Sequence, residues 1–210
     1  MRLVLASTSP RRRELLALLE IPFEVRPPLY DEVMDANRTA GDLVHAFAGA
    51  KAMSVAAQEP DALVLASDTL IECDDTPLGK PEDLAHARSM LRRLAGRVHV
   101  VTTAVSALCP VRRFARTELS SARVWMKPFD VDAHERYLAT NDSLGKAGAY
   151  SIQGPGADLI ERLEGDFTAV VGFPLRVVAR LLAQGGMTVP VDVDFLYRKR
   201  PYGNWSRFFG

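Results

Sequence analysis

The chain has 210 residues, enough for one large domain or two small ones with a buried core. Hydrophobic residues make up 48% of it and charged residues 25%, which is typical of an ordinary globular protein. The 26 basic residues balance the 26 acidic ones, so the overall charge argues against a nucleic-acid polymer or a membrane surface as a partner.

The hydrophobic pattern alternates between strand and helix signals along the chain. Strands are predicted at 2–6, 21–25, 62–66 and 70–73, the last followed by a turn and a short return at 77–78. Helices are predicted at 10–19, 42–57, 81–94, 131–139 and 174–183. Two long β-rich runs, 98–108 and 119–126, favour antiparallel pairing, and runs 159–163 and 167–171 flank a turn. The pattern predicts an α/β protein with a mixed sheet flanked by helices.

The C-terminal stretch differs in character from the rest. No repeat or linker divides the chain before it, so we expect one domain over residues 1–185 and a tail over residues 186–210. Residues 197–205 mix aromatic with basic side chains, a mixture that can stack on bases and bind phosphates. The interpretation we favour is that the tail packs on the body or on a partner subunit.

Cysteine usage and hydropathy predict a cytoplasmic protein. Cys73 and Cys109 lie far apart and match no metal-ligand or redox spacing, which is typical of a reducing compartment. The N-terminus has only about five apolar residues before a cluster of arginines, unlike a signal peptide. No apolar run approaches the roughly 18 residues that a membrane span requires.

The first chemical motif is the start of the helix predicted at 10–19. Ser9 is a good N-cap and Pro10 suits the first turn. Three arginines, beginning with Arg11 and Arg12, then crowd the positive end of the helix dipole, where an anion would relieve their repulsion. With the hydroxyl of Ser7 nearby, this segment is suited to phosphate binding; the alternative is that the arginines only extend into water.

The second motif is Ser67-Asp68-Thr69, placed directly after a predicted buried strand. A carboxylate at the carboxyl end of a strand often points into a ligand crevice, where Asp68 can hold a divalent metal or orient a water molecule. The alternative is an aspartate that caps a turn. Lys80, fixed between glycine and proline, can reach a phosphate or can be an ordinary solvated loop lysine.

The third motif is the glycine-rich run 146–156. Its glycines allow a flat ligand to approach the backbone closely. The side-chain amide of Gln153 can both donate and accept, so it can read the edge of a nucleobase. Tyr150 can stack, although packing is the commoner use of such a tyrosine. The alternative for the whole run is a flexible surface loop.

Taken together, these motifs resemble the Maf, or septum-formation, family of nucleoside triphosphate pyrophosphatases. The resemblance spans roughly residues 3–183 and runs in the expected order. It rests on residues 7–12, Glu32, Lys51, 67–69, 78–81, 96–99, 146–154 and 171–175. It implies an elongated mixed α/β fold like that of Maf and inosine triphosphatase proteins, a homodimer, and hydrolysis of a nucleoside triphosphate to the monophosphate and pyrophosphate.

The resemblance also implies roles for particular residues. Asp68 falls on the family's proton acceptor, and Arg11, Thr69 and Gln153 fall where base specificity is set. Arg12, Lys51 and Lys80, with Ser7 and the helix N-terminus, would hold the phosphates. Glu32 and Asp68 would help to bind a divalent cation, Mg²⁺ or Mn²⁺, that bridges phosphate oxygens.

The form of the glycine-rich loop resembles the branch of the family that acts on dTTP and UTP. The chain departs from the family pattern at Ser67, Gly145 and Ser151, none of which is a proposed catalytic group. Alternative functions are a pyrophosphatase for modified nucleotides such as 7-methyl-GTP or ITP, and a nucleotide-binding regulator of cell division without turnover. A purely structural subunit fits poorly with so many converging polar groups.

Overall fold

The computed structural model describes residues 1–35 and 37–209, so residue 36 of the irregular acidic segment 27–39 and residue 210 of the expected tail lie outside it. The described strands are β1 (Leu3–Ala6), β2 (Glu24–Arg26), β3 (Leu63–Cys73), β4 (Thr76–Leu78), β5 (Val98–Cys109), β6 (Phe114–Met126) and β7 (Ile160–Gly165). The described helices are α1 (Pro10–Ala17), α2 (Ala40–Ala56), α3 (Leu84–Leu94), α4 (Val131–Ala139), α5 (Phe167–Val171), α6 (Leu175–Gln184) and α7 (Val193–Lys199). Short 3₁₀ turns are η1 (Pro110–Arg112), η2 (Ala147–Ala149), η3 (Pro155–Leu159) and η4 (Trp205–Phe208).

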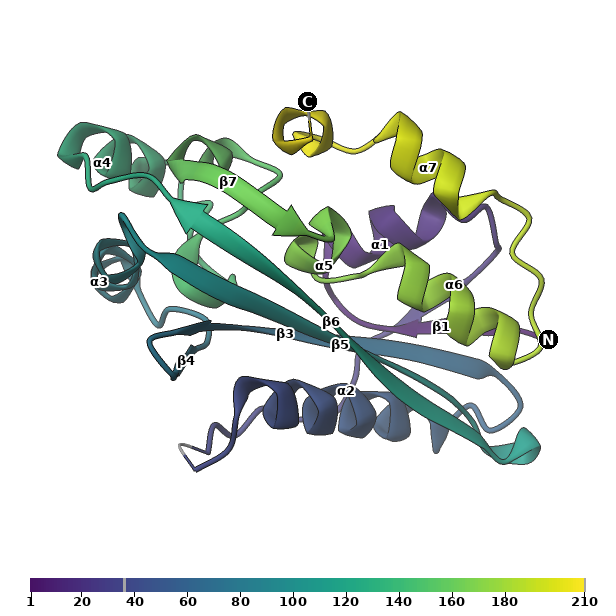
Figure 1. Ribbon diagram of the computed structural model, residues 1–210. Coiled ribbons are helices and arrows are strands. Elements are labelled where there is room, and N and C mark those ends of the chain that lie inside the picture. The colour runs from purple at the N-terminus through teal and green to yellow at the C-terminus, as the bar shows by residue number, and fades with distance from the viewer. Residues whose placement is uncertain (36, 210) are drawn as a thin grey trace.

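The described strands form one mixed sheet in the order β2-β1-β3-β5-β6-β7, with β4 paired to β3. Strand β1 is parallel to both of its neighbours, and the remaining pairs are antiparallel. Figure 1 shows β3, β5 and β6 running along the length of the molecule, with α2 on one face of the sheet and α1 and α6 on the other. The predicted mixed sheet flanked by helices and the antiparallel pairing of the two long strands are therefore confirmed.

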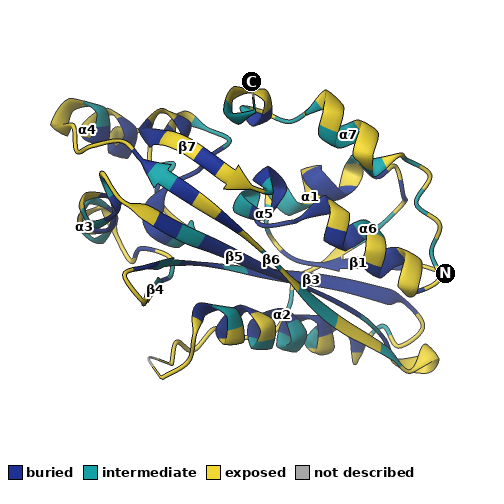
Figure 2. Cartoon of the chain, viewed as in Figure 1, coloured by how far each residue is buried: buried dark blue, intermediate teal, exposed yellow. Residues whose placement is uncertain are grey.

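Buried apolar side chains hold the helices against the sheet. Leu15, Leu16 and Leu19 are fully buried, as the helical spacing of the first helix predicts, and they pack with α6 against β1, β3 and β5. On the opposite face α2 buries residues at helical spacing, including Phe47. Figure 2 shows β3 buried along almost its whole length, as expected of a central strand covered on both faces.

Strand β3 differs from the sequence prediction. Two strands with a break at residues 67–69 were expected, so that Asp68 would follow a strand, but β3 continues unbroken to Cys73. The polar side chains at the expected break are satisfied within the fold: the Ser67 hydroxyl donates to the Gly172 carbonyl at 2.9 Å, and the Thr69 hydroxyl bonds to that of Thr103 at 2.8 Å. Because these groups lose no hydrogen bonds on burial, the ladder continues, and Asp68 lies in mid-strand rather than capping a turn.

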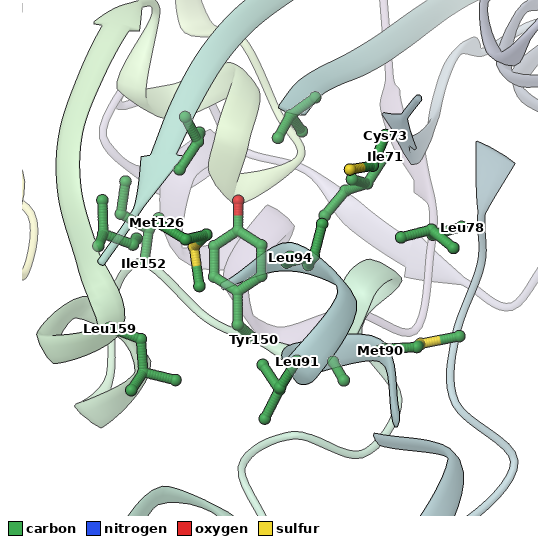
Figure 3. Close-up of a cluster of buried hydrophobic side chains, with 14 of the residues drawn as sticks. Ile71, Cys73, Leu78, Met90, Leu91, Leu94, Met126, Tyr150, Ile152 and Leu159 are labelled. Carbon is green, nitrogen blue, oxygen red and sulfur yellow. The ribbon is translucent and has the colours of Figure 1, made fainter. Parts of the chain in front are cut away.

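The glycine-rich run 145–156 is largely buried rather than a flexible surface loop. Tyr150 is only 5% exposed and lies in an apolar cluster with Ile71, Leu94 and Met126 (Figure 3). Its hydroxyl bonds to the buried His99 ring at 2.8 Å. Tyr150 therefore packs within the fold, the commoner use of such a tyrosine, and it also lines the cavity described below.

The C-terminal residues pack on the body of the protein, as expected. Trp205 is 2% exposed and belongs to the same apolar cluster as Tyr150. The helix α7 and the turn η4 within this stretch were not predicted. Among the described residues, no helix has both the length and the apolar character needed to cross a membrane.

Candidate active site

One cavity of about 550 Å³ brings all the predicted site residues together. They come from the end of β1, the first turn of α1, the acidic segment, α2, the middle of β3, the turn before α3 and the glycine-rich loop. They are Ser7, Arg11, Arg12, Glu32, Lys51, Asp68, Thr69, Lys80 and Gln153. Residues up to 146 positions apart in sequence, from Ser7 to Gln153, thus share one cleft.

A chain of charged groups forms the floor of the cavity. Lys51, buried on α2, donates from Nζ to the Asp68 carboxylate and to Oε1 of Glu32, the latter at 2.5 Å. Lys80 donates to both carboxylate oxygens of Glu32 at 3.2 Å. The Lys51 and Asp68 side chains are 8% and 4% exposed, whereas that of Lys80 is 56% exposed. The two lysines therefore differ: Lys51 is fixed between carboxylates, and Lys80 can move toward a ligand.

The environment moves the pKa values of the two carboxylates in opposite directions. Burial disfavours the charged form of Glu32, but the hydrogen bond and charge of Lys51, with those of Lys80, outweigh it and lower the pKa to about 2. For Asp68 burial dominates and raises the pKa, although the charges of Lys51 and Arg12 oppose it. Two neighbouring carboxylates thus differ in basicity, which is typical of sites that move protons.

Asp68 keeps one oxygen unoccupied. Lys51 binds Oδ1, while Oδ2 is buried and has no hydrogen-bond partner within residues 1–35 and 37–209. A buried acceptor of this kind is costly unless a ligand, a water molecule or an ion completes it. Within the described part of the chain no three His, Cys, Asp or Glu side chains group as metal ligands. Glu32 and Asp68 nevertheless fit Mg²⁺, which is commonly held by one or two carboxylates together with substrate phosphates.

The first turn of α1 brings arginines to the same cavity. Arg12 donates from Nε to the Gly172 carbonyl at 3.1 Å, and Arg11 donates to the Ser151 hydroxyl at 3.3 Å. Ser9 is the N-cap residue of α1, as predicted, but its side chain makes no capping hydrogen bond, and its N–H donates to the Ser7 hydroxyl oxygen at 3.1 Å. Without an acidic residue or a side-chain cap in its first turn, α1 is suited to an anion.

The cavity is also lined by neutral polar groups, Gln153 and Thr69 among them. Gln153 extends from the glycine-rich loop, and its buried Oε1 has no hydrogen-bond partner among the residues that the structure describes. Thr69 lies on β3 with its hydroxyl bonded to Thr103, which in turn donates to the Ala169 carbonyl at 2.7 Å. An amide with an unused acceptor beside apolar side chains is suited to a ring with polar edges.

Sequence reasoning gave no role to two residues, one that lines the cavity and one that holds an arginine of the cavity. Lys146 lines it and pairs with Asp142 at 2.9 Å; it stood in the glycine-rich motif but received no role. The Gly172 carbonyl accepts from both Arg12 and Ser67, and at φ +105° a side chain there would meet the Thr69 hydroxyl at 3.0 Å. The glycine within residues 171–175 was the available signal, since that conformation favours glycine.

Fold and cavity together define an α/β protein that binds a phosphorylated ligand, because cations, hydroxyls and a helix N-terminus surround a buried carboxylate. Comparison of the sequence with known families gives the family: residues 2–185 match the one described as Maf-like protein. The chain belongs to this family, which confirms the resemblance found in its motifs.

Individual relatives match over almost their whole length. The dTTP/UTP pyrophosphatase of Moorella thermoacetica is 46% identical over 188 residues, which is 90% of this chain and 97% of that protein. The dTTP/UTP pyrophosphatase of Bacillus velezensis is 42% identical over 183 residues, 87% of this chain and 96% of that protein. Among solved structures, the Ham1 protein of Staphylococcus aureus aligns with a TM-score of 0.41 and 13% identity over 60% of this chain and 72% of that chain.

Proposed function

We propose that this protein is a nucleoside triphosphate pyrophosphatase that hydrolyses dTTP and UTP to the monophosphate and pyrophosphate. Relatives named for this activity, 46% and 42% identical over nearly their full length, support it. The single observation that carries the proposal is Asp68, whose buried Oδ2 has no partner among the described residues and lies in a cavity lined by Arg12 and Lys80.

The cations of the cavity bind the polyphosphate. A triphosphate carries about four negative charges, and positive groups must be in place before the reaction to stabilise the charge that builds up on pyrophosphate. Arg12 presents a guanidinium next to the first turn of α1, and the Ser7 hydroxyl keeps its proton to donate. Lys80, mostly exposed, is free to leave Glu32 for a phosphate oxygen. Lys51 neutralises the two carboxylates, which would otherwise repel the substrate.

Asp68 activates the attacking water. Lys51 holds Oδ1, so Oδ2 can accept the water's hydrogen bond and aim its oxygen at the α-phosphorus, in line with the departing pyrophosphate. Burial raises the pKa of Asp68, which makes it a stronger base than a solvated aspartate. Glu32 and Asp68 would hold a divalent cation, Mg²⁺ or Mn²⁺, which when bound neutralises charge on the phosphate oxygens.

Gln153, Arg11 and Thr69 recognise the nucleobase. The Gln153 amide can donate to one base position and accept from the next, and its Oε1 has no competing partner among the described residues. Arg11 is held toward the glycine-rich loop through Ser151. Because a buried amide left unpaired is costly, a base with the wrong edge is rejected more strongly than a base of the wrong size.

The proposal has four further features, the first implied by the family and the others by cysteine usage and the sequence pattern. They are a homodimer, a location in the cytoplasm, one pyrophosphatase domain over residues 1–185 and a separate C-terminal tail over residues 186–210. Light scattering during size-exclusion chromatography tests the first, with a mass twice that of the 23.1 kDa chain as the expected result. A monomer at micromolar concentration would contradict it.

The function is tested by incubating the protein with dTTP, UTP, CTP, ITP and 7-methyl-GTP in the presence of Mg²⁺ or Mn²⁺, followed by an assay for pyrophosphate. We expect dTTP and UTP to be the best substrates and the reaction to stop when the metal is chelated. Preference for ITP or 7-methyl-GTP would identify a pyrophosphatase for modified nucleotides. Nucleotide binding without any product would identify a regulator and contradict the proposal.

A further inference from the structure

The residues beyond position 185 lie outside the range matched by the family model, and the proposed function assigns them no role. We call residues 186–209 the C-terminal segment. After α6 it crosses the outside of the molecule through α7, drawn in yellow in Figure 1, and ends near β7. Its contacts reach two elements of the cavity, the glycine-rich loop and α1.

An aromatic anchor fixes the C-terminal segment to the body. Trp205 is 2% exposed and stacks on Phe167 of α5, with ring centroids 5.5 Å apart and planes 8° from parallel. Tyr197 meets the Trp205 ring edge-on at 4.9 Å, and its hydroxyl donates to the Asp166 carboxylate at 2.8 Å. Burial of so large an aromatic surface, with its polar neighbour satisfied, gives the segment a defined position.

The neighbouring residue, Asn204, contacts the backbone of the glycine-rich loop. Its side-chain Nδ2 lies 3.1 Å from the Ile152 carbonyl oxygen, 2.8 Å from that of Gln153 and 3.1 Å from that of Gly154. An amide has two N–H groups, so three consecutive carbonyls share two donors. Three carbonyls converging on one donor require a particular loop conformation, and the Gln153 side chain projects from the middle of it.

The C-terminal segment also contacts the helix that carries Arg11. The Tyr202 hydroxyl donates to the Glu14 carboxylate at 2.5 Å, and Glu14 is one helical turn from Arg11 on α1. The segment therefore contacts two of the three elements to which the proposed function assigns the nucleobase, the glycine-rich loop and α1. Among the described residues it forms no hydrogen bond with the charged groups Lys51, Asp68 or Lys80, which bond to one another and to Glu32.

We propose that Asn204 is a positioning residue for nucleobase selection, acting by fixing the backbone of residues 152–154 so that the Gln153 amide faces the base. The proposal rests on the proposed function of Gln153. Loss of the Asn204 amide leaves the three carbonyls without their shared donor and lets the loop adopt other conformations. Discrimination between bases then falls, while the chemistry at Asp68 is kept.

Two substitutions remove the amide in different ways. Asn204 has φ 64°, a left-handed conformation that glycine adopts without strain, so Asn204→Gly removes only the side chain. Asn204→Asp keeps the shape but replaces the donor with an acceptor facing three carbonyls, and is expected to have the larger effect. The matched control is Asn141→Gly, since Asn141 is exposed at φ 57° and its side chain makes no hydrogen bond within the described residues.

The measurement is the ratio of kcat/KM for UTP to that for CTP, which differ at the base edge alone. For Asn204→Gly we expect this ratio to fall about tenfold, the effect of one lost hydrogen bond, through a higher KM for UTP with kcat nearly unchanged. Hydrogen exchange of residues 150–156 should accelerate, and Asn141→Gly should match the unchanged protein in both measurements. Equal losses of kcat for both nucleotides, with the ratio kept, would overturn the proposal.

A second measurement separates this proposal from the proposed function. Binding of UMP and CMP to the same variants measures base selection without any catalysis. One outcome is that the protein releases no pyrophosphate but binds UMP more tightly than CMP, and that Asn204→Gly abolishes this preference. That result would contradict the proposed pyrophosphatase activity and support the positioning role of Asn204. If neither binding nor turnover differs between the variants and the unchanged protein, the positioning role fails whatever the activity.

Discussion

At the Asp68 end of the cavity, charged side chains on a helix and a strand hold one another directly. At the Gln153 end, a loop is held by Tyr150 beneath it and by the amide of Asn204 from outside. The first arrangement depends on α2 and β3, which are central to the fold, whereas the second depends in part on Asn204, which lies beyond the residues matched by the family model. We infer that hydrolysis and base selection can be altered separately.

Asp68→Asn provides the strongest test of the charged end. The amide cannot accept a proton from water, so we expect turnover to fall by about 100- to 10,000-fold, as is common when a general base is lost. Base selection should be unchanged, because Gln153 and Arg11 are untouched. Single-turnover assays with dTTP measure the rate, and thermal unfolding checks the fold. Turnover near that of the unchanged protein would remove Asp68 from the mechanism.

Lys51→Met tests whether the buried charges stabilise the fold as well as the reaction. Removing the ammonium leaves Asp68 and Glu32 without their shared partner, and breaking a buried ion pair in this way costs about 3–5 kcal/mol. Urea unfolding without metal should show a loss of that size. Added Mg²⁺ should restore part of it, because a cation between the two carboxylates replaces the missing charge.

The control for Lys51→Met is Arg88→Met. Arg88 pairs with Glu135 through two hydrogen bonds of 2.7 Å, but both side chains are more than a third exposed. Its loss should cost less than about 1 kcal/mol, as for most surface ion pairs. If the two substitutions lowered the free energy of unfolding equally, Lys51 would contribute no more than a surface lysine. If added Mg²⁺ did not restore stability to Lys51→Met, Glu32 and Asp68 would not be metal ligands.

Acid should destabilise the protein through His99, the buried residue that bonds to the Tyr150 hydroxyl of the glycine-rich loop. Burial lowers the pKa of His99 from 6.5 to about 4, so between these values the unfolded chain takes up a proton that the folded protein does not. The contribution of His99 to stability is therefore constant above pH 6.5 and falls by about 3 kcal/mol as the pH decreases to 4. Urea unfolding across this range measures it, and His99→Gln should flatten the curve; an unchanged slope would contradict the assignment.

Of the substitutions at the charged residues of the cavity, Lys80→Ala should change activity and stability least. Lys80 is mostly exposed, and in the proposed function it gives one charged hydrogen bond to a phosphate, so kcat/KM should fall about 10- to 100-fold for every nucleotide alike. The melting temperature should stay within a few degrees of the original, roughly the shift caused by less than 1 kcal/mol. Unfolding of this variant would mean that Lys80 is structural, and a change in base preference would contradict its place at the phosphate end.

Local sequence patterns predicted much of the fold. Helix α4 begins and ends where the pattern predicts, at Val131 and Ala139, because Asp130 caps its first turn. The break expected in β3 was wrong. Ser, Asp and Thr residues in sequence indicate a turn, and only the hydrogen-bond partners of Ser67, Asp68 and Thr69 show that these side chains can lie within a strand. Those partners, Gly172, Lys51 and Thr103, are distant in sequence and are brought near only by the fold.

The site shows the same limit. Asp68 and the arginines were found because charged residues in a motif indicate chemistry by their type, whereas Lys51 was found only through the family resemblance. Asn204 was not found, since its partners are three carbonyl oxygens about 50 residues earlier in the chain, and a backbone carbonyl has no signature in a sequence. Contacts between a side chain and a distant backbone can therefore be recognised only in three dimensions.

The stacking of Trp205 on Phe167 has a practical use. The chain contains two tryptophans, and Trp205 is buried whereas Trp125 lies partly open beside the guanidinium of Arg162. Indole emission shifts to longer wavelength when the ring enters water, so release of the C-terminal segment would be visible as a red shift. A Trp125→Phe variant would leave Trp205 as the single tryptophan, whose emission could follow that release in real time without any attached label.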